Sequence, residues 1–306
     1  MIELKEVLIE LSNNCNLSCK MCGYGQKPIE KKRFMSWTLF EKIISDLKGK
    51  AKIIRLNGRG ESTIHPEFNR MLTYTKENIP ETGIHLFTNL SFRNSNTLDA
   101  FRNYNTQLFV SIDSPDKNEL ESIRYNCDYG LIMNNLKRLS DMQIRPFLVF
   151  TIMEDNLNRI YDIANFAITN DLNIIYNTVR YDDGMEEFTE LISQNIEEIK
   201  TQFNKVESLY LDSNLKCIYP DQISGINLEL EASTKTYGDS RSCPSLNSQL
   251  CILYDGLVSP CNMFNPYIFG DLKVQSLEEI WSSDKRNYFI KNYKKYYYCK
   301  NCACMG

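Results

Sequence analysis

Three cysteines near the N-terminus are the residues whose spacing points most directly to chemistry. Cys15, Cys19 and Cys22 form a CxxxCxxC pattern. They follow an apolar run at residues 7–11 that predicts a buried strand, so the thiols lie on the loop leaving that strand. A 4Fe–4S cube takes four cysteine thiolates, one for each iron, and three ligands leave one iron open for chemistry. The alternatives are a disulfide or half of a structural zinc site, which would need a fourth ligand nearby.

This pattern resembles the signature of the radical S-adenosylmethionine (SAM) superfamily. The resemblance implies that the open iron binds the amino and carboxylate groups of SAM, and that an electron from the cluster splits the sulfonium. The resulting 5′-deoxyadenosyl radical would take a hydrogen atom from a substrate C–H bond. The electron would come from a donor of the flavodoxin or ferredoxin type. The residue before the third cysteine is usually aromatic in the family, and here it is Met21, which is apolar and polarizable enough to shield a cluster edge.

The composition predicts a cytoplasmic globular protein. The chain has 306 residues, enough for one large α/β unit and a smaller domain. Its net charge of −4 gives no general attraction to nucleic acid, and we expect the Lys- and Tyr-rich stretch at residues 285–300 to pack on a neighbouring domain instead. The N-terminus runs directly into the first strand, so we expect neither a signal peptide nor a membrane span. Eleven cysteines would remain reduced in a cytosol.

Alternating apolar runs and amphipathic stretches predict six strand–helix units. The strands are expected at residues 7–11, 53–57, 84–88, 108–112, 147–152 and 173–179. The helices are expected at residues 37–47, from about 66, near 96–102, within 117–142 and at 158–168. This alternation implies a parallel sheet with right-handed crossovers. Six units, as the resemblance also implies, give an α/β fold with an open partial (β/α)6 TIM-like barrel whose active site lies at the carboxyl ends of the strands.

Polar residues follow these strand ends. Gly58, Gly60 and Glu61 lie in an Asn-Gly-Arg-Gly-Glu run that resembles the family's GGE motif, which holds the SAM amino group, although Ser62 stands where the family often has proline. The other matches are Asn89 after the third strand, Ser111 and Asp113 after the fourth, and Arg124 beyond them. The resemblance places Asn89 at the border of the SAM pocket, and Ser111 and Asp113 beside the ribose or the carboxylate of SAM. It places Arg124 near that carboxylate, which a guanidinium can bind in bidentate fashion.

A second cysteine group predicts another metal site. Its members are Cys243, Cys251, Cys261, Cys299, Cys302 and Cys304. Asp255-Gly256 predicts a hairpin turn among them. The layout resembles the SPASM/twitch domain, and the chain end at Gly306 favours the shorter twitch form with one auxiliary 4Fe–4S cluster. The ligands that the resemblance implies are Cys243, Cys261, Cys299 and Cys302. Cys251 or Cys304 could replace one of them, and zinc would accept the same spacing.

These features predict three regions and a substrate class. The barrel core is expected over residues 1–182, a helix and linker region over 183–242, and an α+β twitch domain over 243–306. The closing segment resembles the subgroup of dehydrogenases that oxidise an aminocyclitol in butirosin biosynthesis. Because the chain begins at its first strand, without a peptide-recognition domain, we expect a small polar substrate such as a sugar, aminocyclitol or nucleotide sugar. Modification of a ribosomally made peptide, by epimerisation or crosslinking, and a non-catalytic iron–sulfur electron carrier are the alternatives.

The substrate radical could end in oxidation or in epimerisation. In oxidation the radical loses a proton and passes an electron to the auxiliary cluster, whereas in epimerisation a thiol returns a hydrogen atom from the opposite face. Cys217 and Cys251 are the candidate hydrogen donors, because they lie in a segment expected to face the substrate. Unassigned cysteines are also commonly small buried apolar residues. The resemblance favours oxidation slightly.

Overall fold

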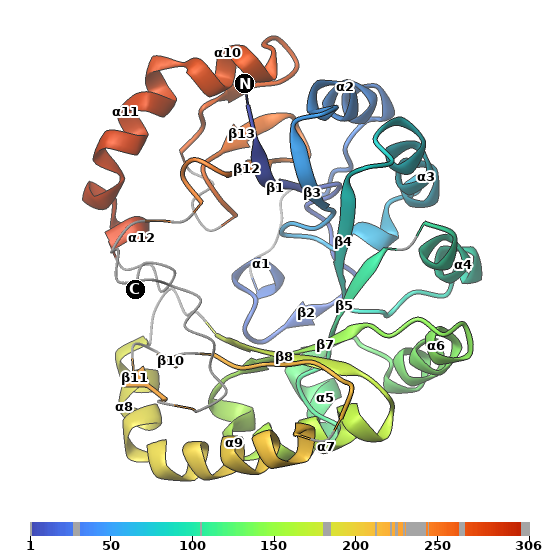
Figure 1. Cartoon of the computed structure of the whole chain (residues 1–306), viewed down its shortest axis with the longest axis vertical. Helices are drawn as coiled ribbons and strands as arrows, with labels where there is room; N and C mark the ends of the chain where they lie inside the picture. Colours follow the sequence, from blue (N-terminus) through green and yellow to red (C-terminus); the bar gives the residue numbers. More distant parts are fainter. Residues whose placement is uncertain are drawn as a thin grey trace.

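The computed structural model describes residues 2–26, 31–104, 106–179, 185–211, 213–220, 222–223, 226–228, 230, 243, 245–262 and 267–300. A curved sheet at its centre has the strand order β14-β13-β12-β1-β3-β4-β5-β7-β8-β9 (Figure 1). The six strands of the predicted units are β1 (Leu4–Ile9), β3 (Ala51–Arg55), β4 (Gly83–Thr88), β5 (Gln107–Ser111), β7 (Phe147–Ile152) and β8 (Asn173–Thr178). All five pairings between them are parallel, which confirms the predicted α/β partial barrel.

Helices cover the outer side of the curved sheet (Figure 1). They are α2 (Trp37–Leu47), α3 (Phe68–Asn78), α4 (Ser95–Asn103), α6 (Tyr129–Asp141), α7 (Ile160–Thr169) and α9 (Ile196–Tyr210). Helix α2 begins where predicted, because the Ser36 side chain accepts a hydrogen bond from the Leu39 N–H. Its buried face, including Phe40 and Ile43, belongs to the large core between helices and sheet.

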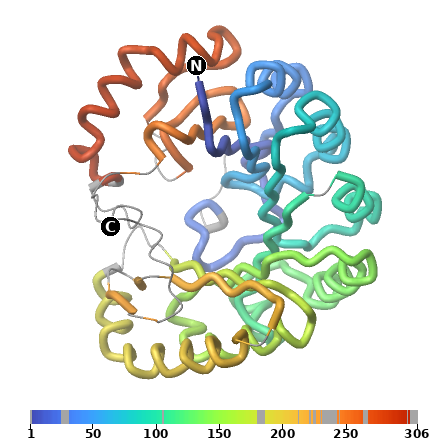
Figure 2. The backbone as a smooth tube through the Cα atoms, viewed as in Figure 1, coloured from blue at the N-terminus to red at the C-terminus, as the bar shows by residue number. Residues whose placement is uncertain are grey.

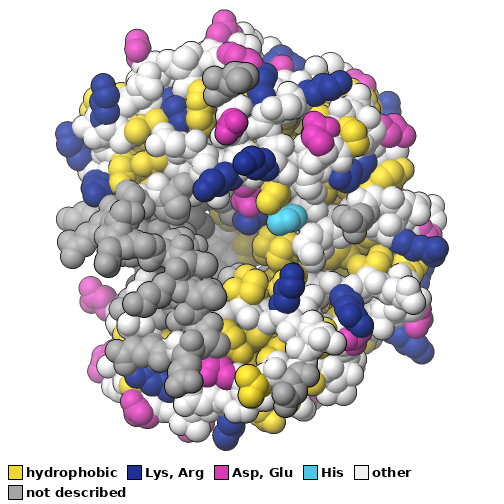
Figure 3. Space-filling view, viewed as in Figure 1, with side chains coloured by type: hydrophobic (Ala, Val, Ile, Leu, Met, Phe, Trp, Pro, Cys, Tyr) yellow, Lys and Arg dark blue, Asp and Glu magenta, His cyan; other side chains and the backbone are white. Residues whose placement is uncertain are grey.

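The inner side of the sheet carries a separate apolar cluster. Phe87 stacks on Phe109 with ring centroids 4.4 Å apart, and Phe109 stacks on Phe147 at 5.4 Å. Val149 and Ile175 belong to the same cluster. Since successive side chains of a strand point to opposite faces, these residues identify the inner face at each strand. The face of the molecule in Figure 3 is hollowed near its centre, with hydrophobic side chains around the hollow.

The C-terminal segment adds strands to this same sheet. Strand β12 (Gln249–Ile252) runs parallel to β1, and β13 (Leu257–Ser259) and β14 (Gly270–Asp271) follow in antiparallel order. The path of the chain therefore brings C-terminal residues beside the first strand (Figure 2). The predicted hairpin is confirmed, with Gly256 at φ +85° in its turn. Helices α10 (Leu277–Ser282), α11 (Asp284–Asn292) and α12 (Tyr297–Lys300) complete this end.

Several short elements were not predicted. Strands β2 (Ser18–Cys19) and β6 (Arg124–Tyr125) pair with each other, and β6 separates α5 (Lys117–Ile123) from α6. The single helix expected within residues 183–242 is two helices, α8 (Met185–Gln194) and α9, divided at Asn195. The remaining short elements are α1 (Gly23–Gln26), β9 (Cys217–Ile218), β10 (Gln222–Ile223) and β11 (Ile226–Asn227). No helix in the described ranges is long and apolar enough to cross a bilayer.

Candidate functional site

The three N-terminal cysteines lie on the loop that leaves β1, as predicted. Cys15, Cys19 and Cys22 are each partly exposed, and the Cys22 N–H donates to the Cys19 carbonyl at 3.1 Å. Across the described ranges, no three Cys, His, Asp or Glu side chains gather as ligands of a single ion would. Each thiolate of a cube binds a different iron, so the cysteines of a cluster need not converge on one point.

The loop after β3 packs directly against the cysteine loop. The Glu61 N–H donates to the Asn14 carbonyl at 2.9 Å. A Cβ atom at Gly60 would overlap the carbonyl oxygens of Ser12 and Asn14, which are backbone atoms next to Cys15. A Cβ atom at Gly58 would lie 2.5 Å from Glu10 Cγ. These two glycines therefore allow the motif to approach the cysteine loop closely.

We expect Gly60→Ala to displace the cysteine loop and to lower the iron bound at the first cluster site. The added methyl group meets backbone that cannot rotate away, so the cost is a shift of the loop itself. Gly83→Ala is the matched control, because its Cβ would find its nearest neighbours at 3.6 Å, an ordinary contact distance. Iron content after anaerobic reconstitution measures the difference. Equal iron in the two variants would contradict this packing role.

Glu61 ties the β3 loop to the end of β4. Its Oε1 accepts hydrogen bonds from the Thr63 and Thr88 hydroxyls at 2.6 and 2.9 Å, and its Oε2 accepts from the Asn89 N–H at 2.8 Å. Burial raises the pKa of Glu61, and these donors oppose that shift. The Asn89 side chain donates to the Asn16 side chain at 2.9 Å and lies 3.9 Å from Cys15 Sγ. Glu61 and Asn89, singled out separately in the sequence, thus lie together beside the first cysteine.

Asp113 and Arg124 form a buried ion pair. Arg124 Nη2 lies 2.6 Å from Asp113 Oδ2, and the Thr151 N–H donates to Asp113 Oδ1 at 2.9 Å. Arg124 Nη1 lies 3.8 Å from Cys19 Sγ. The Asp113 carboxylate is fully buried, so this structure engages it with Arg124 rather than presenting it to a ligand. Ser111 pairs with Val149 and therefore lies on the inner face of the sheet.

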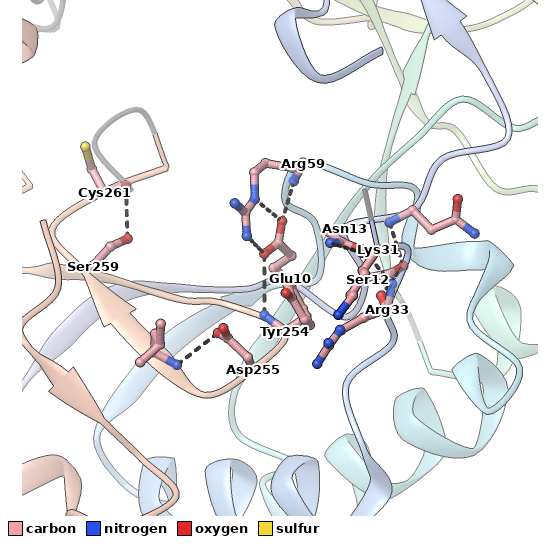
Figure 4. A network of polar contacts seen from close by, with 12 residues as sticks. Glu10, Ser12, Asn13, Lys31, Arg33, Arg59, Tyr254, Asp255, Ser259 and Cys261 are labelled. Carbon is pink, nitrogen blue, oxygen red and sulfur yellow. Dashed lines mark hydrogen bonds and ion pairs between the residues drawn. The ribbon is translucent and has the colours of Figure 1, made fainter. Parts of the chain in front are cut away.

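A second buried pair, Glu10 with Arg59, was missed by sequence reasoning (Figure 4). Glu10 is 1% exposed and binds Arg59 through both carboxylate oxygens, at 2.7 and 2.6 Å. The Tyr254 N–H of the β12–β13 hairpin reaches Glu10 at 3.4 Å, and the Arg59 guanidinium lies 5.4 Å from the Tyr24 ring. The pair joins β1, the β3 loop and the C-terminal hairpin. An acidic residue at the end of an apolar strand was the signal that could have revealed it.

A cavity of about 720 Å³ opens beside the cysteine loop. Lys20 and Met21 line one side of it, and residues of α8 line another. The acidic side chains in its lining are Glu154, Asp155, Glu187 and Glu190. The single basic residue of the lining, Lys20, is paired with Asp155 at 2.9 Å. The cavity is of ligand size and its lining is negative.

The two candidate hydrogen donors lie on opposite faces of the sheet. Cys251 pairs with Leu8 in β12 and is buried with it on the inner side, where burial raises the pKa of its thiol to about 12. Cys217 pairs with Ile174 and packs into the core between sheet and helices. The expectation that Cys217 faces the substrate is therefore wrong, because strand alternation turns it toward the helices.

The C-terminal cysteines are described in part. Cys243, Cys261 and Cys299 are partly exposed and border the main core, and the Cys243 N–H donates to the Tyr293 hydroxyl at 3.4 Å. Cys302 and Cys304 lie outside the described residues.

The residues of the N-terminal site fit an iron–sulfur cluster and SAM. Burial raises the pKa of Cys15 to about 12, and coordination to a metal is what would deprotonate such a thiol. Donors already face the sulfurs, including the Leu17 N–H at 3.4 Å from Cys15 Sγ and the cationic Arg124 beside Cys19. Asn14 Oδ1 and Asn57 Oδ1 are buried acceptors without a donor from the described residues. Buried acceptors of this kind suit an ammonium group such as that of SAM.

Comparisons with known proteins identify two family models and a curated relative that match this chain. A family model described as Radical SAM superfamily matches residues 9–167, and one described as SPASM, an iron–sulfur cluster-binding domain, matches residues 243–303. A curated relative from Pyrococcus furiosus, named tungsten-containing aldehyde ferredoxin oxidoreductase cofactor-modifying protein, is 23% identical over 334 residues, covering 98% of this chain and 87% of the relative.

Solved structures share the fold. Streptococcus suis SuiB bound to S-adenosylmethionine gives a TM-score of 0.75 at 16% identity, covering 99% of this chain and 71% of SuiB. BtrN in complex with AdoMet and 2-DOIA gives a TM-score of 0.52 at 15% identity, covering 100% of this chain and 92% of BtrN. At these identities the likeness concerns the fold.

Proposed function

Because the chain belongs to the radical SAM superfamily and carries a C-terminal iron–sulfur cluster-binding domain, we propose that it abstracts a hydrogen atom from a small polar substrate. When bound, the cluster and SAM supply an electron and a 5′-deoxyadenosyl radical. The observation that carries the proposal is the close packing of the cysteine loop against Gly60 and Glu61, which joins the proposed cluster ligands to the proposed SAM site.

The chain's own residues would bind and orient these groups. Cys15, Cys19 and Cys22 are the proposed ligands of the first cluster. Asn14 Oδ1 and Asn57 Oδ1 would accept hydrogen bonds from the SAM ammonium group, since both are buried without a donor from the described residues. Asp113 would hold the Arg124 guanidinium beside Cys19, where the positive charge of Arg124 offsets the charge of the thiolate.

The second cysteine group would hold one auxiliary 4Fe–4S cluster. We propose Cys243, Cys261, Cys299 and Cys302 as its ligands. We also retain the division into a barrel core over residues 1–182, a linker region over 183–242 and a C-terminal domain over 243–306. An iron and zinc count after reconstitution tests the auxiliary site, with about eight irons expected per chain. About four irons with one zinc would contradict an iron–sulfur auxiliary site.

The cavity beside the cysteine loop favours a substrate that carries an amine. Asp155 pairs with Lys20, so these two charges offset each other, and the carboxylates of Glu154, Glu187 and Glu190 leave the lining negative enough to attract an ammonium group. An aminocyclitol or amino sugar combines this charge with a size that fits about 720 Å³.

The test compares 5′-deoxyadenosine formation with aminocyclitols, neutral sugars and short peptides as additives. We expect the amine-bearing small molecules to stimulate formation, because only they combine small size with positive charge. Stimulation by neutral sugars alone would contradict the amine requirement. The same assay separates an enzyme from a non-catalytic electron carrier, which would form no 5′-deoxyadenosine under any of these conditions.

A ribosomally made peptide is the second candidate substrate. SuiB in its crystal structure bound to precursor peptide SuiA gives a TM-score of 0.74 at 15% identity, higher than the 0.52 of BtrN. Stimulation by peptides alone in the assay above would favour this candidate over the small polar substrate.

The fate of the substrate radical is testable in D2O, and we expect oxidation. The product should be two mass units lighter than the substrate and free of deuterium, because oxidation removes hydrogen and returns none. Cys251 is the remaining candidate donor for epimerisation, since its raised pKa of about 12 keeps the thiol protonated at pH 8. Deuterated product of unchanged oxidation state, lost in Cys251→Ala and retained in Cys217→Ala, would establish epimerisation instead.

A further inference from the structure

Three consecutive basic residues lie next to the cysteine loop. Lys31, Lys32 and Arg33 are all exposed, and none forms an ion pair with a residue that the structure describes. Phe34 follows them and is 39% exposed. We call residues 31–34 the basic patch.

The backbone of the basic patch is fixed to the residues just before Cys15. The Asn13 side chain accepts from the Arg33 N–H at 2.7 Å and donates to the Lys31 carbonyl at 3.0 Å. The Ser12 hydroxyl donates to the Arg33 carbonyl at 3.0 Å, and Ser12 forms an antiparallel bridge with Phe34. Figure 4 shows Lys31 and Arg33 gathered around Ser12 and Asn13, with Cys261 on the other side of the Glu10–Arg59 pair.

This attachment sets the distance between the patch and the first cluster site. Asn13 and Cys15 are two residues apart, a separation of at most about 7 Å along the chain. These hydrogen bonds to Ser12 and Asn13 use backbone atoms of residues 31 and 33 rather than their side chains. The cations are thus held close to the site while their charges stay in solvent.

The charge of the patch differs from that of the whole chain. The chain has a net charge of −4, whereas the patch carries three positive charges without a single acidic residue. An acidic protein is repelled by the net charge and attracted at the patch, which orients its approach. An exposed aromatic ring beside arginine is also typical of the centre of a protein interface.

We propose that the basic patch docks an acidic ferredoxin, which reduces the cluster held by Cys15, Cys19 and Cys22. This inference rests on the proposed function, since it assigns the surface on which the electron donor of that same site docks. Ferredoxins of the plant type have potentials near −400 mV and carry one electron at a time. One electron leaves the reduced ferredoxin and enters the oxidised cluster, leaving an oxidised ferredoxin and a singly reduced cluster, and no proton or bond is exchanged.

The experiment measures the rate of cluster reduction by stopped-flow absorbance, with either reduced ferredoxin or dithionite as the donor. The variant is Lys31→Glu/Lys32→Glu/Arg33→Glu in the reconstituted full chain. We expect its second-order rate constant with ferredoxin to fall at least about tenfold at low salt, because electrostatic steering is lost. With dithionite, which needs no docking, the rate should equal that of the unaltered protein.

A second triple variant separates the patch from the net charge. Lys5→Glu/Lys48→Glu/Lys52→Glu makes the same charge change at exposed lysines near the amino ends of β1 and β3, away from the strand ends that carry the cysteines. This variant should slow cluster reduction by ferredoxin much less than the patch variant does. Raising the ionic strength should lower the rate at which ferredoxin reduces the cluster of the unaltered protein, and should bring that rate toward the rate of the patch variant.

The outcomes distinguish the docking proposal from the proposed function. Two results would overturn the docking proposal and leave the proposed function standing. One is equal slowing of ferredoxin-driven reduction in the two triple variants. The other is no slowing in the patch variant while dithionite still reduces the cluster. If dithionite gives neither a reduced cluster nor 5′-deoxyadenosine with the unaltered protein, the proposed function fails and the docking proposal fails with it. Iron contents of the three proteins should be equal, since the bonds that hold the patch use its backbone atoms and the side chains of Ser12 and Asn13, which no variant changes.

Discussion

Replacing Cys15, Cys19 and Cys22 together with alanine will remove about four of about eight irons per chain and abolish reductive cleavage of SAM. These thiols are the proposed ligands of the cluster whose open iron binds SAM. The auxiliary cysteines lie at the other end of the chain and bring their own ligands, so their iron should remain. Iron content and the electron paramagnetic resonance spectrum of the reduced protein measure the loss.

Cys127→Ala is the control for this triple variant. Cys127 is also partly buried, and burial raises the pKa of its thiol to about 11, but neither proposed cluster uses it. Its replacement should leave both the iron content and SAM cleavage unchanged. A triple variant that still cleaves SAM would contradict the assignment of the first cluster to these cysteines.

Asp113→Asn will destabilise the protein by about 3–5 kcal/mol, because it leaves the Arg124 charge buried without a partner. Arg124 is 7% exposed and Asp113 is fully buried, so water cannot replace the lost carboxylate. The Thr151 N–H can still donate to the asparagine oxygen, but the asparagine NH2 group then faces Arg124, so the variant loses the acceptor for Arg124 together with the charge. Anaerobic urea unfolding followed by circular dichroism gives the free energy of unfolding.

An exposed ion pair provides the comparison for Asp113. Glu67 and Arg70 lie 2.7 Å apart with side chains 38% and 58% exposed, so Glu67→Gln should cost less than about 1 kcal/mol. If Asp113→Asn cost no more than Glu67→Gln, the pair would not be buried and ionised as the structure has it.

The barrel was predictable because its signals are local. Each parallel strand is a short apolar run, such as the run that became β7, and Ser36 caps α2 through a bond within its own turn. The hairpin turn at Asp255-Gly256 is equally local, since the turn needs a residue that accepts positive φ. The cysteine loop could be placed because it follows the first of these runs directly.

The contacts that complete the site could not be predicted, because they join residues far apart in the sequence. Glu10 and Arg59 are separated by one strand–helix unit, and Tyr254 reaches Glu10 from the other end of the chain. Hydrophobic periodicity predicts that a segment is a strand but not which strand it pairs with. The parallel pairing of β12 with β1 was therefore seen only in the structure. The strand β9 is two residues long, too short for its alternation to reveal that Cys217 faces the helices.

The central claim is that this chain binds a SAM-cleaving cluster at Cys15, Cys19 and Cys22. The measurement that tests it most directly is 5′-deoxyadenosine formation from SAM by the anaerobically reconstituted protein after reduction with dithionite. The account predicts 5′-deoxyadenosine from the unaltered protein and none from the triple alanine variant. Unaltered protein that holds about eight irons, is reduced by dithionite and still forms no 5′-deoxyadenosine would contradict the account.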